Sequence, residues 1–171
     1  WCNGKLLGKG NWEGRLPAGR HTIEYRKEGH KSSSKEIAVN NATFYEHTLA
    51  APVPLYGAIE IYTNPDNAEV YIDGVFAGHT PIVKRDVLSG KRNITLKLPN
   101  YAAKSTIMEV VEGEMTEAMI SLDKWMAVTI NSYPQNSSVQ IDGIRIGTTP
   151  LTDTIMAGEH HIHISSPHYN N

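Results

Sequence analysis

The chain has 171 residues, and its 16 Lys and Arg against 18 Asp and Glu leave a net charge of −2. The two signs are mixed along the chain, so no basic surface favours nucleic acid or an anionic membrane. No apolar run approaches the ~18 residues that a membrane-spanning helix needs. We therefore expect no nucleic-acid partner and no direct membrane insertion by this fragment.

The first two residues bear on processing and on cysteine chemistry. The chain begins at Trp1 without an initiator Met or a signal-peptide pattern, which favours a fragment or mature portion of a longer protein. Cys2 is the only cysteine, which excludes an internal disulfide framework and a Cys-rich metal site. Cys2 is either a lipid-attachment residue or an inward-facing strand residue that packs as a small hydrophobe. The repeat described next favours the second interpretation.

The chain is internally repetitive, which is typical of a tandem array. Residues 58–82 match residues 127–151 at a constant spacing of 69, with eleven of 25 positions identical. A weaker first copy aligns Asn3 with Asp73, which places Cys2 at the position of Ile72. The predicted organisation is a first module at 1–49 that is N-terminally incomplete, a Pro-containing linker at 50–57, a complete second module at 58–122, a short joint at 123–125, and a third module at 126–171 that is C-terminally incomplete.

Apolar residues within a module alternate with a period of two, as half-buried strands require. Ile59 and Ile61 alternate with polar or amphipathic residues, and so do Ile94 and Leu96. Asx-Gly pairs at 3–4, 73–74 and 142–143 predict type I′ hairpin turns, which need positive φ at both positions. With six or seven strands expected in the second module and no sustained helical period, the sequence predicts an all-β fold of tandem small antiparallel β-sandwich modules.

The two connections between modules differ in length. The linker at 50–57 contains Pro-Val-Pro, which favours an extended, semi-rigid spacer. Only residues 123–125 separate the second and third modules, so we expect these two to lie close together. Trp125 is then either a wedge between them or a cap on the core of one module.

Short motifs in the second and third modules resemble the PEGA family of bacterial repeat modules. The motifs are Pro65-Asp66-Asn67-Ala68 and Pro134-Gln135-Asn136-Ser137, each followed by a Val-x-Ile-Asp-Gly hairpin and by Gly78-His79-Thr80-Pro81 or Gly147-Thr148-Thr149-Pro150. Both tetrapeptides carry Asn where the motif has Gly, and Asn tolerates positive φ. The resemblance implies a small sandwich of transthyretin-like or immunoglobulin-like type, a bacterial envelope location in the periplasm or at the cell surface, and no catalytic residues.

Histidines near the C-terminus are the sharpest candidate for metal chemistry. His161 and His163 have a spacing that suits Zn²⁺ or Cu²⁺ on one strand face, with His168 as the nearest third ligand. Their equivalents in the second module are Asn93 and Thr95, which indicates ordinary surface positions. No nucleophile motif such as Gly-x-Ser-x-Gly and no His-Glu-x-x-His occurs. We expect no metal, no cofactor and no enzymatic activity.

Aromatic side chains are the remaining candidates for binding. Trp1, Trp12, Tyr62 and Tyr71 are expected at outward positions, where they either stack on sugar rings or simply fill cross-strand positions. The first functional hypothesis is a spacer or protein-binding scaffold that contacts other envelope proteins, with Trp125 at a joint. The alternative is a glycan-binding module that recognises an envelope or host polysaccharide through these aromatics.

Overall fold

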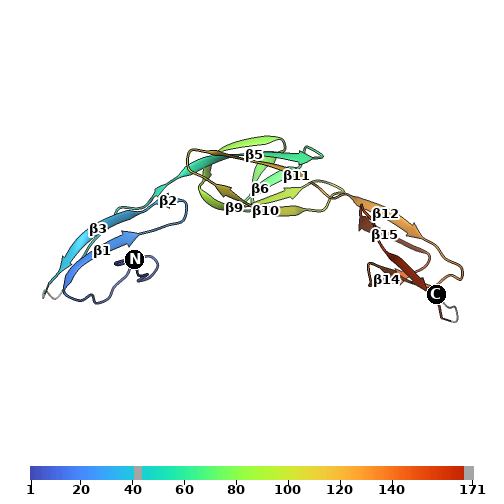
Figure 1. Ribbon diagram of the computed structural model, residues 1–171, viewed down its shortest axis with the longest axis horizontal. Coiled ribbons are helices and arrows are strands. Elements are labelled where there is room, and N and C mark those ends of the chain that lie inside the picture. The colour runs from blue at the N-terminus through green and yellow to red at the C-terminus, as the bar shows by residue number, and fades with distance from the viewer. Residues whose placement is uncertain (41–43, 168–171) are drawn as a thin grey trace.

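The computed structural model describes residues 1–40 and 44–167, and every regular element in these ranges is a β-strand. The strands form small sheets that follow one another along an elongated, bowed chain (Figure 1). Within the described ranges no helix is long and apolar enough to cross a bilayer. The predicted all-β fold is confirmed.

The second module contains seven strands in two sheets, within the predicted number. One sheet has the order β10-β9-β6-β7 and the other the order β11-β5-β8. Neighbouring strands are antiparallel except β11 and β5, which run parallel because the chain passes through β10 of the other sheet before it returns to β5. The bounds are β5 Tyr56–Asn64, β6 Glu69–Ile72, β7 Val75–His79, β8 Ile82–Leu88, β9 Gly90–Lys97, β10 Lys104–Val110 and β11 Met115–Ser121.

The two sheets of the second module share one apolar core. Alternation places Ile59 and Ile61 of β5 opposite Ile94 and Leu96 of β9, and all four side chains are fully buried. Burial of each such side chain stabilises the fold by about 1.5–3 kcal/mol. The transthyretin-like or immunoglobulin-like type of the module stays a prediction.

The Asx-Gly pairs form the tight turns that the sequence predicts. In each pair both residues have positive φ: 46° and 81° at Asn3-Gly4, 49° and 82° at Asp73-Gly74, and 51° and 81° at Asp142-Gly143. Asn67 and Asn136, which replace the motif glycine, have φ of 64° and 63°. Asn adopts this left-handed conformation more readily than other non-Gly residues. The replacement therefore preserves the local backbone.

A buried threonine in each Gly-x-Thr-Pro segment fixes the tetrapeptide motif. Thr80 Oγ1 accepts a hydrogen bond from the Ala68 N–H at 3.0 Å, and backbone bonds join Thr80 to Asn67 and Ala68. Thr149 makes the same contacts with residues 136–137. The peptide bonds that precede Pro65, Pro81, Pro134 and Pro150 are cis. In both modules, therefore, the threonine of the Gly-x-Thr-Pro segment holds that segment against the tetrapeptide motif.

The third module repeats this plan with a smaller described core. β12 (Trp125–Ile130) pairs with β15 (Leu151–Met156), and a second sheet has the order β14-β13-β16. The buried apolar cluster consists of Ile130, Val139 and Ile141 with partly buried neighbours. The bounds of the second sheet are β13 Ser138–Ile141, β14 Ile144–Thr148 and β16 Ile162–Ser165.

Residues 1–40 contain the same strand pairing as the second module. β1 (Gly19–Tyr25) pairs with β3 (Ser33–Val39) in the register Gly19 to Val39, and β9 pairs with β10 in the register Gly90 to Val110, 71 residues further on. Cys2 bridges Ile23, as Ile72 pairs with Ile94. The Cys2 side chain is only 6% exposed, which confirms that it packs as an inward-facing residue.

Replacement of Thr80 by valine tests the buried motif contact. Thr80→Val keeps the volume but leaves the buried Ala68 N–H without its acceptor, which costs about 1–3 kcal/mol of unfolding free energy. Chemical denaturation should show this loss. Thr106→Val, at an exposed position of β10, is the control, and its effect should stay within about 0.5 kcal/mol. Equal effects of the two variants would contradict this role of Thr80.

Candidate functional site

The Asx side chain of each hairpin turn binds the backbone of a strand that is distant in sequence. Asp73 Oδ1 accepts a hydrogen bond from the Asn93 N–H at 2.8 Å, and Asp142 Oδ1 accepts one from the His161 N–H at 2.9 Å. Asn3 Oδ1 accepts the equivalent bond from the Thr22 N–H at 2.8 Å. The turn is thereby fixed to the strand that follows the next glycine turn.

The second side-chain oxygen or nitrogen of the Asx residue contacts a nitrogen-containing side chain on that strand or, in the third module, just before it. In the second module Arg92 Nη1 donates to Asp73 Oδ2 at 2.9 Å, and Arg92 Nη2 donates to the Ser89 carbonyl at 3.1 Å. The pairs Asn3–His21, Asp73–Arg92 and Asp142–His160 occupy equivalent positions, and we call each of them a turn clamp. Each clamp holds two turns of its module together.

In the third module the turn clamp requires a charged imidazole. His160 Nδ1 lies 2.7 Å from Asp142 Oδ2, and His160 Nε2 lies 2.7 Å from the Met156 carbonyl oxygen. Both partners are acceptors, so both ring nitrogens donate only when the ring is protonated. The hydrogen bond to Asp142 and then the Met156 carbonyl raise the pKa of His160, and the bond from His160 and then the His161 N–H lower the pKa of Asp142.

In the first turn clamp a neutral imidazole satisfies both contacts. His21 Nε2 lies 2.9 Å from the Pro17 carbonyl, and His21 Nδ1 lies 3.1 Å from Asn3 Nδ2. The Asn3 amide orientation follows from its Oδ1, which accepts the Thr22 N–H. Its Nδ2 therefore donates to an unprotonated Nδ1. The change from Asn to Asp at one turn position thus changes the charge state that suits the paired histidine.

Arg92 also connects its turn clamp to Glu28, which lies in the loop that follows β1. Its Nη2 lies 3.8 Å from a carboxylate oxygen of Glu28, while its own side chain is only 13% exposed. Its buried Nε has no hydrogen-bond partner among the described residues. Arg92 is therefore held by Asp73, the Ser89 carbonyl and Glu28 together.

The first joint is a short β-ribbon and not a free linker. β2 (His30–Lys31) pairs with β4 (Val53–Pro54), so the Pro-containing segment is tied to the first part of the chain. The Leu55 N–H donates to the Gly29 carbonyl at 2.8 Å, and the Leu55 carbonyl accepts from the Ser89 N–H at 2.8 Å. β5 then begins at Tyr56, inside the segment 50–57 that the sequence indicates as a linker.

The second joint has the same hydrogen-bonding plan. Lys124 forms a bridge with Tyr101, and the Trp125 N–H donates to the Asn100 carbonyl at 2.8 Å. The Lys124 carbonyl accepts from the Ala157 N–H at 2.7 Å. Asn100 has φ of 67° and Gly29, at the equivalent place in the first joint, has φ of 70°. Both joints therefore place one left-handed residue beside the incoming strand.

Trp125 takes part in the second joint through its backbone. Its side chain is 40% exposed, which is more than a wedge buried between two modules would be. Its N–H binds Asn100, and its strand position pairs with Met156. The close joint that we expected at 123–125 therefore rests on main-chain hydrogen bonds.

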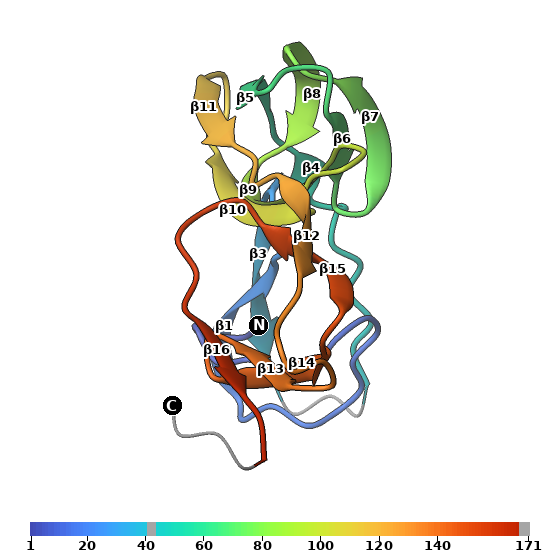
Figure 2. The same ribbon diagram turned by 90° about the vertical axis from the view of Figure 1, so that its right-hand side faces the viewer.

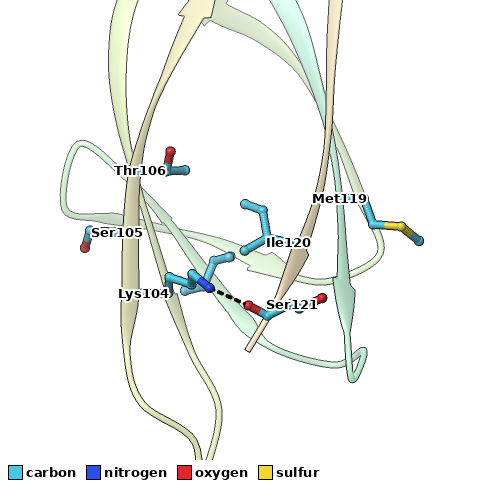
Figure 3. Close-up of a pocket in the computed structure, with 7 residues that line it drawn as sticks. Lys104, Ser105, Thr106, Met119, Ile120 and Ser121 are labelled. Atoms are coloured by element: carbon cyan, nitrogen blue, oxygen red, sulfur yellow. Dashed lines mark hydrogen bonds between the residues drawn. The ribbon is translucent and has the colours of Figure 1, made fainter. Parts of the chain in front are cut away.

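A shallow hollow lies between the edge strands β10 and β11 of the second module (Figure 3). Its volume is about 360 Å³. Lys104 Nζ donates to the Ser121 carbonyl at 2.8 Å and so bridges the two sheets across it. The lining residues are Leu96, Lys104, Ser105, Thr106, Met119, Ile120 and Ser121. They include no carboxylate or histidine, so the hollow offers no acid–base pair.

The aromatic candidates do not form one platform. Tyr62 lies on β5 and Tyr71 on β6, which belong to the two different sheets of the second module. Trp1 and Trp12 belong to the first part of the chain; Trp12 is 40% exposed, whereas Trp1 is half-buried, with the Arg26 guanidinium 4.7 Å from the ring centroid. Tyr71 instead contacts Phe76 edge-on and lies under the Lys97 ammonium at 4.7 Å.

The histidine candidates for a metal site are placed only in part. His163 lies on β16 opposite Gln140, and His161 precedes that strand with its N–H bound to Asp142. His168 lies outside the described residues. Within the described ranges no group of three or more His, Cys, Asp or Glu side chains is arranged to hold a metal ion.

The turn clamps are the arrangement that sequence reasoning missed. The repeat alignment already placed Asn3, Asp73 and Asp142 at one position, and it placed His21, Arg92 and His160 at another. Both positions carry side chains that can form hydrogen bonds in every copy. The sequence could therefore have indicated that the side chains at these two aligned positions form hydrogen bonds with each other.

Comparison with known proteins identifies two modules. Residues 56–124 and residues 125–171 each match the family model of the PEGA domain, and together they cover more than half of the chain. No match was found among curated proteins or among solved structures. The described residues at the three turn clamps, the two joints and the hollow show no catalytic arrangement.

The His160 turn clamp should make the third module less stable as the solution becomes alkaline. The folded pKa of His160 is raised above its ordinary value of 6.5. The stability that His160 contributes to the folded module is therefore fully present below pH 6.5 and is lost as pH rises through the folded pKa. The lowered pKa of Asp142 adds stability above 3.8 that is lost as pH falls through the folded pKa. Thermal unfolding and NMR titration of the His160 ring measure both effects.

The matched control for this prediction is Asp142→Asn. It restores the Asn–His pair of the first copy, in which a neutral ring satisfies both contacts. This variant should remove most of the pH dependence near neutrality while preserving the fold. An unchanged pH profile in Asp142→Asn would show that the clamp does not titrate with folding.

Proposed function

The chain belongs to the PEGA domain family, and we propose that it serves as a non-catalytic spacer of the bacterial cell envelope that keeps its modules at fixed spacing and orientation. The observation that carries this proposal is the set of backbone hydrogen bonds across both joints, from Leu55 to Gly29 and Ser89 and from residues 124–125 to Asn100 and Ala157. Backbone bonds of this kind restrict the dihedral angles that a flexible linker would leave free.

The chemistry of the described residues supports a non-catalytic role. The shifted pKa values of Asp142 and His160 are explained by their mutual hydrogen bond, and the pair ties two turns together. A catalytic acid or base also needs a substrate cavity beside it. The hollow between β10 and β11 is in the other module, and no titratable pair lines it.

The glycan-binding alternative lacks a comparable observation. Flat recognition of a sugar chain would need two or more of Trp1, Trp12, Tyr62 and Tyr71 on one face. Tyr62 and Tyr71 lie on different sheets of one module. We therefore propose the spacer and scaffold function alone, with other envelope proteins as the partners.

Gly29→Ala tests whether the first joint is rigid. A Cβ at residue 29 would lie 2.6 Å from the Ser89 carbonyl oxygen, across the joint, at a φ of +70°. The clash should separate the two modules and release the Leu55 N–H from the Gly29 carbonyl. We expect faster hydrogen exchange at Leu55, by about tenfold or more, and a broader distribution of lengths in small-angle scattering.

Gly10→Ala is the matched control. It imposes a similar strain at a φ of +72°, but its Cβ would have no neighbour within 4 Å. Its scattering curve and its exchange at Leu55 should equal those of the parent chain. A parent chain that already scatters as freely jointed modules would overturn the spacer function.

A further inference from the structure

The outer face of the β11-β5-β8 sheet combines exposed apolar side chains with two carboxylates. Met119 is 80% exposed, Val83 46% and Tyr62 40%. The strand registers place Met119 beside Tyr62, Glu117 beside Glu60, and Glu60 beside Val83. We call this surface, formed by Glu60, Tyr62, Val83, Glu117 and Met119, the β5 face.

Within residues 1–40 and 44–167, no cation pairs with the two carboxylates of the β5 face. Glu60 and Glu117 are direct cross-strand neighbours, and like charges in such positions destabilise a sheet. Among the described residues neither forms an ion pair. The Tyr62 hydroxyl donates to Glu60 at 2.6 Å. This bond, then the charge of Glu60, burial and the charge of Glu117, raise the pKa of Tyr62. The face therefore carries uncompensated negative charge.

The fold itself does not require this arrangement. In the third module the positions of Glu60, Tyr62 and Val83 are occupied by Thr129, Asn131 and Thr152. Thr129 pairs with Thr152 in the same strand register, and their hydroxyl oxygens are 3.2 Å apart. The same scaffold thus forms with uncharged polar residues, and the acidic and apolar side chains are a special feature of the second module.

The β5 face is also open to a partner. In Figures 1 and 2 the sheet that contains β5 lies on the convex side of the bowed chain, away from the modules on either side. Exposed apolar surface rimmed by polar groups marks interaction sites on soluble proteins, and methionine adapts to varied partner shapes.

We propose that the β5 face docks a cationic segment of a protein partner, with a Lys or Arg side chain between Glu60 and Glu117 and apolar neighbours on Met119 and Val83. The carboxylates supply charge-assisted hydrogen bonds, and the Tyr62 ring supplies a cation–π contact. Two carboxylates supply at most four oxygen atoms, which is fewer than the 6–8 oxygen ligands that Ca²⁺ takes. The charge and the apolar surroundings together fit a basic side chain. This site goes beyond the spacer function and does not depend on it.

The test is an NMR titration of the isotopically labelled chain with a short peptide in which lysine alternates with valine. Amide shifts should concentrate at Glu60, Tyr62, Glu117 and Met119. The double variant Glu60→Thr with Glu117→Thr should weaken binding by about tenfold or more. Threonine is the residue that the third module has at the position of Glu60. Glu109→Gln, which removes one charge from exposed β10 of the other sheet, should leave the affinity unchanged.

Several outcomes would overturn the proposal. These are shifts that cluster on another surface, unchanged affinity in the double variant, or equal binding of a peptide in which glutamate alternates with valine. Calcium chloride alone producing the same shifts would assign a metal site instead. If the double variant loses the dispersed spectrum of the parent, Tyr62→Asn replaces it and should also weaken peptide binding. Rigid scattering with no peptide binding would reject the β5 face while leaving the spacer function intact.

Discussion

A nitrogen-containing side chain bound to the Asx residue of a hairpin turn is the contact on which the arrangement of these modules depends. In the second module Arg92 connects Asp73 of the hairpin, the Ser89 carbonyl of the next turn and Glu28 of the preceding segment. Ser89 in turn donates its N–H to Leu55 at the first joint. The position of the strand that follows Leu55 is therefore coupled, through Ser89 and Arg92, to the Asp73-Gly74 turn. Asp73 also accepts the N–H of Asn93, twenty residues later in the chain.

The same coupling explains why the modules form joints and not linkers. A small module buries too little surface to be very stable alone, so neighbouring units gain from ordered contacts. The described core of the third module is small, with three buried apolar residues, and its β15 end is tied to Lys124 through the Ala157 N–H. Residues in the left-handed conformation, Gly29 and Asn100, let the preceding loop approach each joint closely.

Sequence reasoning succeeded where structure depends on local chemistry. The type I′ turns, the strand number of the second module and the inward packing of Cys2 follow from Asx-Gly pairs, from period-two alternation and from alignment of the copies. The parallel pairing of β11 with β5 and the ribbon of β2 with β4 were not predicted. Both pairings join the main chains of segments that are distant in sequence, and the residue types of these segments do not indicate which strand they pair with. For Trp125 we expected a role of the side chain, as a wedge or as a core cap, whereas its backbone N–H makes the contact with Asn100.

Comparison between copies also separates positions that build the fold from positions free to acquire a function. Thr80 and Thr149 make equivalent buried contacts, and the turn clamps recur with different residues that keep the same geometry. Outward positions differ in chemistry, as Glu60 and Thr129 show on equivalent strands. The shared positions account for the scaffold without Glu60, Tyr62 or Val83, and this excess of charge and apolar surface in one module is the basis of the proposed docking at the β5 face.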